Sequence, residues 1–370
     1  MANIVLAGGG TAGHVNPLLA TANAIREESP QSHVVAIGTD AGLETTLVPE
    51  ADIALETIER VPLPRSVSLD IVRLPMKMRS AISAAGSILD RHKADVVIGF
   101  GGYVSTPVYL AARKRKIPVV VHEGNARPGV ANKVGARFAA TVALTFPSTP
   151  LRAAKGITVS VGLPLKREIE QLAARPGGRR AARRECAARF GLNPDEPIML
   201  ITGGSSGAQH LNDVFSEAAA DIRAAGIQVI HVTGRDKDAP VREAAPDAGY
   251  VVLDYLDDME SAYAAADLAV SRAGAGMVAE LSALGLPAVF VPLPIGNGEQ
   301  ALNAKDVVNA GGAIMIDNKK LDADVVRERI IPLFEGTTLE KMSERSTGVS
   351  PLNAASRLAG IALHLTEVVR

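Results

Sequence analysis

The chain has 370 residues, enough for two domains of ordinary size, and its 47% hydrophobic and 21% charged residues are typical of a globular protein. A formal net charge of −1 excludes a strong overall attraction to nucleic acid, and we expect no nucleic-acid partner. The single cysteine, Cys186, excludes an internal disulfide and a thiolate metal cluster.

The N-terminus runs directly into an apolar strand at residues 4–7, without a basic segment or a cleavage site. This pattern predicts no signal peptide. We also find no apolar stretch of the roughly 20 residues that a membrane-spanning helix needs. The sequence therefore predicts a protein that stays in the cytosol or lies on a membrane without crossing it.

A glycine-rich turn at residues 8–13 follows the first strand and precedes a helix whose apolar residues recur at helical spacing: Val15, Leu18, Leu19, Ala22 and Ile25. Glycine lets the backbone approach an anion closely, and a helix N-terminus offers unpaired N–H groups, so the turn resembles an anion cradle. It also matches a dinucleotide fingerprint, but the acidic residue that such a site needs would be Asp40, late and in a loop. A purely structural tight turn is a third interpretation.

His14 lies at the start of this helix. An isolated histidine there is often only a surface or capping residue. However, the positive end of a helix disfavours an imidazolium, so we expect a neutral ring that can accept a proton. A base beside a phosphate cradle suits the activation of a hydroxyl nucleophile.

Short apolar runs at 34–37, 96–99, 119–122 and 141–144 predict buried parallel strands. Polar residues follow two of them, in the loops 99–105 and 122–125. Because ligands collect at the carboxyl ends of such strands, we expect His14, Tyr103, Glu123 and Asn125 to face one crevice. A simple strand-to-helix corner is the alternative for the loop 99–105.

Residues 67–88 combine leucine, isoleucine, valine and methionine with Arg73, Lys77 and Arg79, and a cationic run follows at 113–116. Such segments indicate docking on anionic lipid, at about 1 kcal/mol per basic residue near the surface. Solvated helix ends would have the same composition.

The pattern of strands and helices restarts after a hinge near residues 162–165. An arginine-rich segment at 179–189 predicts an exposed helix, and the predicted strands are 198–202, 228–232, 251–254, 268–271 and 288–292. The fold class is α/β, with two Rossmann-like doubly wound parallel-sheet domains facing across a cleft. We place the domains at 1–163 and 164–350, with a last helix at 351–370 packing back onto the first.

A second glycine-rich turn, at 203–208, follows the first strand of the second half. The segment 271–280 also leads from a strand into a helix, and Glu280 there suits either the helix dipole or a ribose diol. A polar loop at 296–300 has the amides that sugar sites use. The sequence contains no acidic or histidine-based metal motif, so we expect no metal site.

The segments GGGTAGHVNP, GFGGYVSTP, HEGNARPGVANK, GGSSGAQHLN, SRAGAGMVAE and GNGEQALNA occur in this order, and together they resemble the MurG family. The resemblance covers residues 3–365. It implies a GT-B fold and an inverting transfer of GlcNAc from UDP-GlcNAc to the muramoyl 4-hydroxyl of undecaprenyl-diphosphate-MurNAc-pentapeptide (lipid I). It implies no metal and no other cofactor.

The resemblance also implies roles for single residues. His14 and Glu123 are the rival catalytic bases. The implied substrate-binding residues are Thr11, Ala12, Gly13, Tyr103, Asn125, Lys166, Ser205, Leu256, Ala275, Gly276, Met277, Val278, Ala279, Glu280 and Gln300. Two positions depart from the family's usual pattern: Lys166 replaces an arginine, and Glu299 replaces the first of two glutamines.

As partners, the resemblance implies the donor UDP-GlcNAc, the acceptor lipid I, anionic inner-membrane lipids, and proteins of cell-wall synthesis and division. It implies a peripheral position on the cytoplasmic face of the bacterial cell membrane. Three alternatives stay open from the residues themselves: a UDP-GlcNAc epimerase, a NAD-dependent oxidoreductase, and a non-catalytic sugar-nucleotide sensor.

Overall fold

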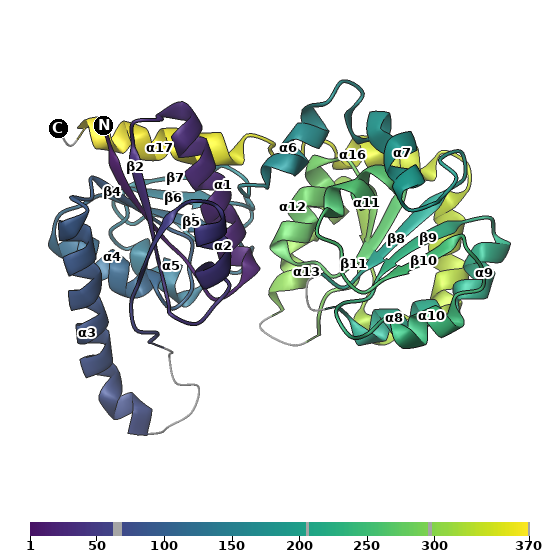
Figure 1. Ribbon diagram of the computed structural model, residues 1–370, viewed down its shortest axis with the longest axis horizontal. Helices are drawn as coiled ribbons and strands as arrows, with labels where there is room; N and C mark the ends of the chain where they lie inside the picture. The colour runs from purple at the N-terminus through teal and green to yellow at the C-terminus, as the bar shows by residue number, and fades with distance from the viewer. Residues whose placement is uncertain (62–68, 205–206, 295–297, 369–370) are drawn as a thin grey trace. The chain divides into compact units, whose positions relative to one another are not determined.

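Alternating strands and helices form two parallel sheets, one in each of two units of the chain (Figure 1). The computed structural model describes residues 1–61, 69–204, 207–294 and 298–368. Unit 1 comprises Met1–Lys166 and Asn353–Arg370, and unit 2 comprises Arg167–Leu352. The polypeptide therefore leaves unit 1 once and returns to it once.

Unit 1 contains a seven-stranded sheet within the described residues, and every pairing in it is parallel. In order across the sheet the strands are β3 (Ala54–Thr57), β2 (His33–Gly38), β1 (Asn3–Ala7), β4 (Val96–Gly99), β5 (Val119–Glu123), β6 (Thr141–Leu144) and β7 (Ile157–Ser160). The chain moves from β1 toward β3 and then returns to place β4 on the other side of β1. The switch point of this sheet, where open α/β folds bind ligands, thus lies between β1 and β4.

Helices cover both faces of this sheet. They are α1 (Ala12–Glu28), α2 (Glu44–Glu50), α3 (Leu69–Arg91), α4 (Ser105–Lys114), α5 (Val130–Gly135) and α17 (Ala354–Val368). Side chains alternate along β1, so Ile4 and Leu6 pack with α1 and α17 while Val5 and Ala7 pack with α3 and α4. Both faces of the strand are buried, which explains its uninterrupted apolar sequence.

The C-terminal helix α17 belongs to unit 1. Its residues Ala355, Leu358, Ala359 and Ala362 are buried in the core cluster that α1 and β1 also form. Arg357 Nη2 donates to the carbonyl oxygen of Ser160, at the end of β7, over 2.7 Å.

Unit 2 contains a six-stranded sheet within the described residues, again parallel throughout. Across the sheet the strands are β10 (Tyr250–Leu253), β9 (Gln228–Val232), β8 (Ile198–Thr202), β11 (Leu268–Ser271), β12 (Ala288–Phe290) and β13 (Ala313–Met315). The α-helices are α6 (Arg167–Ala174), α7 (Gly178–Arg189), α8 (Gln209–Glu217), α9 (Ala219–Ala224), α10 (Ala239–Ala244), α11 (Met259–Ala265), α12 (Ala275–Ala283), α13 (Glu299–Asn303), α14 (Lys305–Ala310), α15 (Ala323–Val325) and α16 (Thr338–Ser346). The remaining turns are the 3₁₀ helices η1 (Asn318–Lys320) and η3 (Ile331–Phe334) and the π-helix η2 (Val326–Ile330).

The order of this sheet repeats that of unit 1: β8 is central, β9 and β10 follow on one side, and β11 begins the other. The second glycine turn follows β8 as the first follows β1. The fold thus places both turns at equivalent positions in their own sheets.

The predicted strands agree with the structure to within one or two residues, but three were not predicted: β3, β7 and β13. β12 ends at Phe290, not at Pro292 as predicted, since proline has no N–H to donate to a neighbouring strand. The predicted arginine-rich helix exists as α7, but the prediction that it is exposed was wrong for one of its faces. The side chain of Arg179 is only 5% exposed and donates to the carbonyl oxygen of Ala266. In the described ranges, no helix combines the length and the apolar character needed to cross a bilayer.

Candidate active site

In unit 1, three loops at the carboxyl ends of the strands approach one another. A Cβ atom added to Gly102, after β4, would lie 2.8 Å from the carbonyl oxygen of Gly9, after β1. A Cβ atom added to Gly124, after β5, would lie 3.9 Å from the carbonyl oxygen of Gly13. The loops that carry Tyr103 and Asn125 thus lie against the first glycine turn, and that their side chains face one crevice with His14 and Glu123 stays a prediction.

His14 lies in the first turn of α1 and is half-buried. Its Nδ1 atom is 3.2 Å from the carbonyl oxygen of Gly9 and 3.2 Å from the hydroxyl of Thr11. Because a carbonyl oxygen can only accept, the contact with Gly9 favours the tautomer with hydrogen on Nδ1 and leaves Nε2 as an acceptor. Gly101 has a φ of +99°, and a Cβ there would lie 3.2 Å from Nε2, so a glycine keeps this side of the ring open.

The pKa of His14 is lowered chiefly by burial, while the carbonyl of Gly9 and the carboxylate of Glu44 raise it. The ring is therefore neutral near pH 7, as predicted. The main cause differs from the prediction, because loss of water around the ring outweighs the other contributions.

Glu123, the rival base, is only 3% exposed at the end of β5. Its Oε1 accepts from the backbone N–H of Asn125, and its Oε2 accepts from the N–H of Gly129 and from Nδ2 of Asn132, each over 2.9 Å. Burial raises the pKa of Glu123, and these three donors oppose that increase. The carboxylate holds the loop 124–129 in place.

Sequence reasoning missed the side chains behind this loop. Asn132 on α5 accepts from the hydroxyl of Tyr109 over 2.9 Å and donates to the carbonyl of His122 over 3.0 Å. His122 is fully buried beneath them, and burial lowers its pKa to about 4. No local pattern marks Asn132, because its partners lie on other elements.

The other predicted residues of unit 1 lie at or near its surface. Thr11 and Gly13 are exposed and Ala12 is half-buried. Tyr103 is 37% exposed, with the guanidinium of Arg60 4.7 Å from its ring centroid. Asn125 is half-buried, and Lys166 is exposed at the end of the first segment of unit 1.

In unit 2, the second glycine turn is tightly built against the backbone. A Cβ on Gly203 would lie 2.3 Å from the N atom of Ala208, and one on Gly207 would lie 2.2 Å from the carbonyl oxygen of Thr233. Gly204 has a φ of +78° with open space around it. The turn opens α8, whose first N–H groups have no acceptor within the helix. Ser205, predicted to bind UDP, lies outside the described residues.

Glu280 lies on α12, after β11, and its Oε2 accepts from the hydroxyl of Tyr263 over 2.8 Å. Tyr263 comes from the neighbouring helix α11 and is 1% exposed, so it fixes this carboxylate from the protein interior. Of the predicted neighbours on α12, Ala275, Gly276 and Met277 are half-buried, whereas Val278 and Ala279 are buried.

Gln300, on α13, links the loops after β11 and β12. Its Oε1 accepts from the N–H of Ala273 over 3.2 Å and from the N–H of Leu293 over 2.9 Å. Arg272, which sequence reasoning missed, donates beneath them to the carbonyl of Val291 and to Oδ1 of Asn318. Leu256 lies half-buried in the loop after β10. In the neighbouring residue, Tyr255, the ring stacks with the guanidinium of Arg235, which lies 4.3 Å from the ring centroid.

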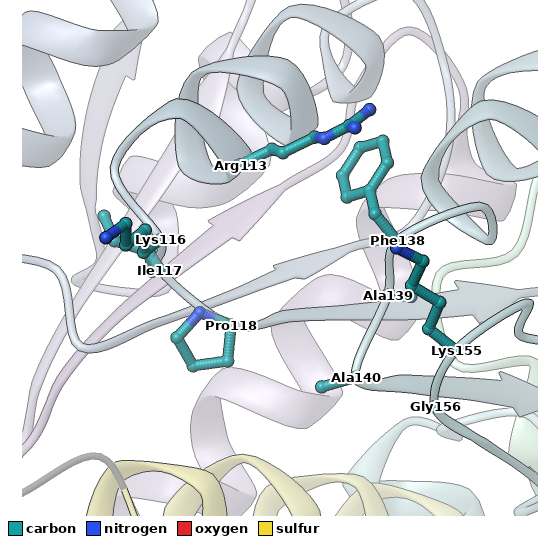
Figure 2. Close-up of a pocket in the computed structure, with 9 residues that line it drawn as sticks. All are labelled: Arg113, Lys116, Ile117, Pro118, Phe138, Ala139, Ala140, Lys155 and Gly156. Carbon is teal, nitrogen blue, oxygen red and sulfur yellow. The ribbon is translucent and has the colours of Figure 1, made fainter.

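The cationic run 113–116 lies at the opposite, amino-terminal edge of the sheet in unit 1. There Arg113, Lys116 and Lys155 line a cavity of about 310 Å³ together with Pro118 and Phe138 (Figure 2). The guanidinium of Arg113 lies 5.0 Å from the centroid of the Phe138 ring. Arg115, in contrast, is paired with Asp90 of α3 over 2.6 Å. The remaining lining residues are Ile117, Ala139, Ala140 and Gly156, so the cavity is basic and apolar.

Within the described ranges, no three histidine, cysteine, aspartate or glutamate side chains gather as a metal site requires. The sites of both units thus consist of backbone N–H groups, carboxylates held by hydrogen bonds, amides and one neutral histidine.

Residues 4–144 match the glycosyltransferase family 28 N-terminal domain, and residues 198–358 match the glycosyltransferase family 28 C-terminal domain. A protein of a Nocardioides species is 49% identical over 98% of this chain and 98% of its own. It is named UDP-N-acetylglucosamine--N-acetylmuramyl-(pentapeptide) pyrophosphoryl-undecaprenol N-acetylglucosamine transferase. The chain belongs to this transferase family, MurG.

Other members agree. The Paenarthrobacter aurescens transferase of the same name is 48% identical over 98% of this chain and 95% of its own. The crystal structure of Acinetobacter baumannii MurG has a TM-score of 0.80 and 29% identity, covering 98% of this chain and 100% of the other. Membership of the MurG family confirms the predicted GT-B fold and makes the protein a glycosyltransferase. It excludes the epimerase, oxidoreductase and sensor alternatives.

Proposed function

We propose that the protein transfers N-acetylglucosamine from UDP-GlcNAc to the muramoyl 4-hydroxyl of lipid I, with inversion of the anomeric carbon. The observation that carries this proposal is the 49% identity, over nearly the whole chain, with a transferase named for that donor and acceptor. The acceptor oxygen forms a bond to the anomeric carbon while the bond from that carbon to the β-phosphate oxygen breaks. UDP leaves with the electron pair, and the hydroxyl proton passes to a base.

Unit 2, with residues 167–352, is proposed as the donor-binding domain. Glu280 suits a ribose diol, because Tyr263 already holds one of its oxygens in a fixed direction. The first N–H groups of α8 and α12 lie beside the glycine turn 203–207 and at Ala275, and they can stabilise the charge that builds on the leaving diphosphate. Leu256 lies in the loop after β10 and is assigned to uracil, and Gln300 lies on α13 and is assigned to the sugar. Ser205 and the backbone from Ala275 to Glu280 complete the proposed donor site.

Unit 1 is proposed to bind the acceptor. Thr11, Ala12 and Gly13 present the N-terminal end of α1 to a diphosphate, with Lys166 as a further cation. Tyr103 and Asn125 lie on the two loops beside that turn, which suits contacts with the sugars. This places the phosphate groups and the hydroxyl of the acceptor near His14.

His14 is proposed as the catalytic base. Its Nδ1 faces the carbonyl of Gly9, its Nε2 faces the open side at Gly101, and burial lowers its pKa. Glu123 is less suited to this role, since three donors already occupy its two oxygens. We assign Glu123 the task of shaping the loop that presents Asn125.

The test is incubation of the purified protein with radiolabelled UDP-GlcNAc and a short-chain lipid I analogue. We expect a lipid-linked disaccharide and stoichiometric UDP. The same reaction without acceptor is the control, because an epimerase would convert UDP-GlcNAc to UDP-ManNAc there. The absence of disaccharide when donor and acceptor are both present, or epimerised nucleotide in the control without acceptor, would contradict the proposal.

The protein is further proposed to lie on the cytoplasmic face of the cell membrane through anionic lipids. In the described part of α3, Met76 is 70% exposed and Arg79 is exposed as well. The basic cavity of Figure 2 adds Arg113, Lys116 and Lys155 on the same unit. Residues 67 and 68 of the predicted lipid-binding segment 67–88 lie outside the described residues.

Sedimentation with vesicles tests this proposal. Replacing Arg113, Lys116 and Lys155 by alanine removes about 3 kcal/mol of attraction and should weaken partitioning onto anionic vesicles about a hundredfold. The matched control replaces three exposed lysines of unit 2, Lys319, Lys320 and Lys341, by alanine. Equal loss in both variants, or equal binding to neutral vesicles, would contradict a specific basic docking surface.

A further inference from the structure

The most deeply buried carboxylate in the described part of unit 1 has no role in the site as described so far. Glu44, at the start of α2, is 0% exposed. Its Oε2 accepts from the backbone N–H of Gly10 over 2.8 Å, and its Oε1 accepts from the N–H and the hydroxyl of Thr39 over 3.0 and 2.8 Å. Burial by itself would raise the pKa of Glu44, but these hydrogen bonds together lower it, so the group is ionised at neutral pH.

Three glycines make room for this side chain. A Cβ atom on Gly9, Gly38 or Gly42 would lie within 2.3 to 2.6 Å of Glu44 atoms. Gly9 belongs to the first glycine turn, and the other two flank the end of β2. The turn after β1 therefore closes on a carboxylate that comes from the segment after β2.

The same turn positions His14. Glu44 binds the N–H of Gly10, and the preceding residue, Gly9, offers its carbonyl oxygen to Nδ1 of His14 at 3.2 Å. The hydroxyl oxygen of Thr11, the residue after Gly10, lies 3.2 Å from the same nitrogen and can accept from it as well. The two groups that hold the imidazole thus belong to Gly9 and Thr11, the residues on either side of Gly10, whose N–H donates to Glu44.

We propose that Glu44 is a positioning residue for the transfer reaction, acting through the turn 9–11 to fix the tautomer and orientation of His14. The proposal rests on the proposed role of His14 as base. Glu44, the peptide between Gly9 and Gly10, and His14 then form one series of hydrogen bonds, from the carboxylate through the peptide to the imidazole. This arrangement also means that the first turn contains its own anion and offers only the N–H groups beyond Gly10 to a substrate phosphate.

The charge of Glu44 acts on His14 directly as well. The groups that face His14 are the carboxylate of Glu44, the carbonyl of Gly9, the hydroxyl of Thr11, and the buried ring of His122, with which it interacts electrostatically. A negative charge nearby favours the imidazolium and raises the pKa of His14. Removal of that charge therefore lowers the pKa, and the fall of kcat on the acid side moves to lower pH.

The experiment compares Glu44→Gln with Glu50→Gln, an exposed carboxylate at the other end of α2. Histidine-detected NMR on the full-length protein gives the titration of His14, and the pH profile of kcat is measured in parallel. For Glu44→Gln we expect the His14 titration and the acid limb to move together to lower pH by about 0.5 or more, and kcat to fall at least tenfold. Glu50→Gln should match the wild type.

Coinciding His14 titrations in all three proteins would overturn the proposal, because a merely structural carboxylate leaves that midpoint in place. If Glu44→Gln does not fold, Glu44→Asp provides the test: it retains the charge but withdraws the oxygen from the N–H of Gly10. We expect at least a tenfold lower kcat with the acid limb unmoved, and full kcat would overturn the proposal. Should His14→Ala itself retain full turnover, the base assignment fails, whereas the NMR titration still reports whether Glu44 acts on His14.

Discussion

The two glycine turns follow the central strands of their sheets, β1 and β8, but differ in what lies behind them. In unit 1 the space behind the turn is filled by the Glu44 carboxylate, which approaches Gly9 and Gly10. In unit 2 the corresponding space is filled by backbone, since Gly207 approaches the carbonyl of Thr233 at the end of β9. One turn carries a negative charge of its own, and the other is closed by neutral peptide groups.

This difference bears on the proposal that equivalent turns in one chain serve different substrates. A buried carboxylate beside the first turn reduces its attraction for a second anion and instead favours a nearby imidazole. On that proposal, the neutral turn at the start of α8 keeps its N–H groups for the diphosphate of the nucleotide. The predictions below test this contrast, beginning with the largest expected effect.

Replacing His14 by alanine should lower kcat by about 10² to 10⁴-fold, the usual contribution of a general base, with little change in KM for UDP-GlcNAc. His364→Ala on α17, an exposed histidine of the same unit, is the matched control. Steady-state kinetics with saturating acceptor measures the effect. Unchanged turnover in His14→Ala would remove this residue as the base and leave the contrast between the turns without a catalytic meaning.

Replacing Gly207 by alanine should destabilise the protein by about 2 to 4 kcal/mol, because a new Cβ meets the carbonyl of Thr233 and φ is +66°. Gly204→Ala is the control in the same turn. It has a positive φ but open space, so we expect only about 1 to 2 kcal/mol. Urea denaturation gives both values, and equal losses would show that the contact with β9 does not constrain the turn.

Glu280→Ala should weaken UDP binding about tenfold or more, as the loss of a charged hydrogen-bond acceptor does. Tyr263→Phe should weaken it less, because the carboxylate remains and only its support from α11 is lost. Glu344→Ala, an exposed carboxylate of α16, is the control. Calorimetric titration with UDP measures all three, and unaltered affinity in Glu280→Ala would contradict the assignment of the donor to unit 2.

Each unit also buries a neutral histidine, His122 in unit 1 and His231 in unit 2. Burial lowers their pKa values to about 4 and about 3, against an ordinary value of 6.5. As the pH falls toward and below 6.5, these histidines bind protons in the unfolded chain but not in the folded protein. The free energy of unfolding therefore decreases as the pH is lowered, by about 0.7 kcal/mol per histidine from pH 7 to pH 6. Thermal denaturation across this range should show the decrease, and His231→Asn should reduce it. A flat profile would contradict the buried neutral state.

Much of the fold was predictable because buried parallel strands are continuous apolar runs. The segments 96–99, 141–144, 198–202, 228–232 and 268–271 match β4, β6, β8, β9 and β11 to the residue. The missed strands β3, β7 and β13 are short and lie at the edges of their sheets. Positions there that stay in part accessible to solvent can be polar, as Glu56, Thr57 and Ser160 are, and such residues interrupt the apolar run.

The candidate site was only partly predictable. Motifs indicated His14, Glu123, Glu280 and Gln300, since each follows a strand and sits in a recognisable segment. Glu44 was missed although the sequence argument sought an acidic residue after the second strand and considered only Asp40. Three residues separate the two in the sequence, and only the folded turn shows which carboxylate reaches Gly10.

The return of the last helix has a consequence for synthesis of the protein. Because α17 supplies Leu358 and Ala362 to the core around α1, the first unit to leave the ribosome is the last to be completed. Unit 2 can fold while unit 1 still exposes the apolar residues of α1 that α17 later covers. A chain released before α17 is made would thus lose the N-terminal unit before the C-terminal one, and chaperone binding during translation should concentrate on that uncovered face.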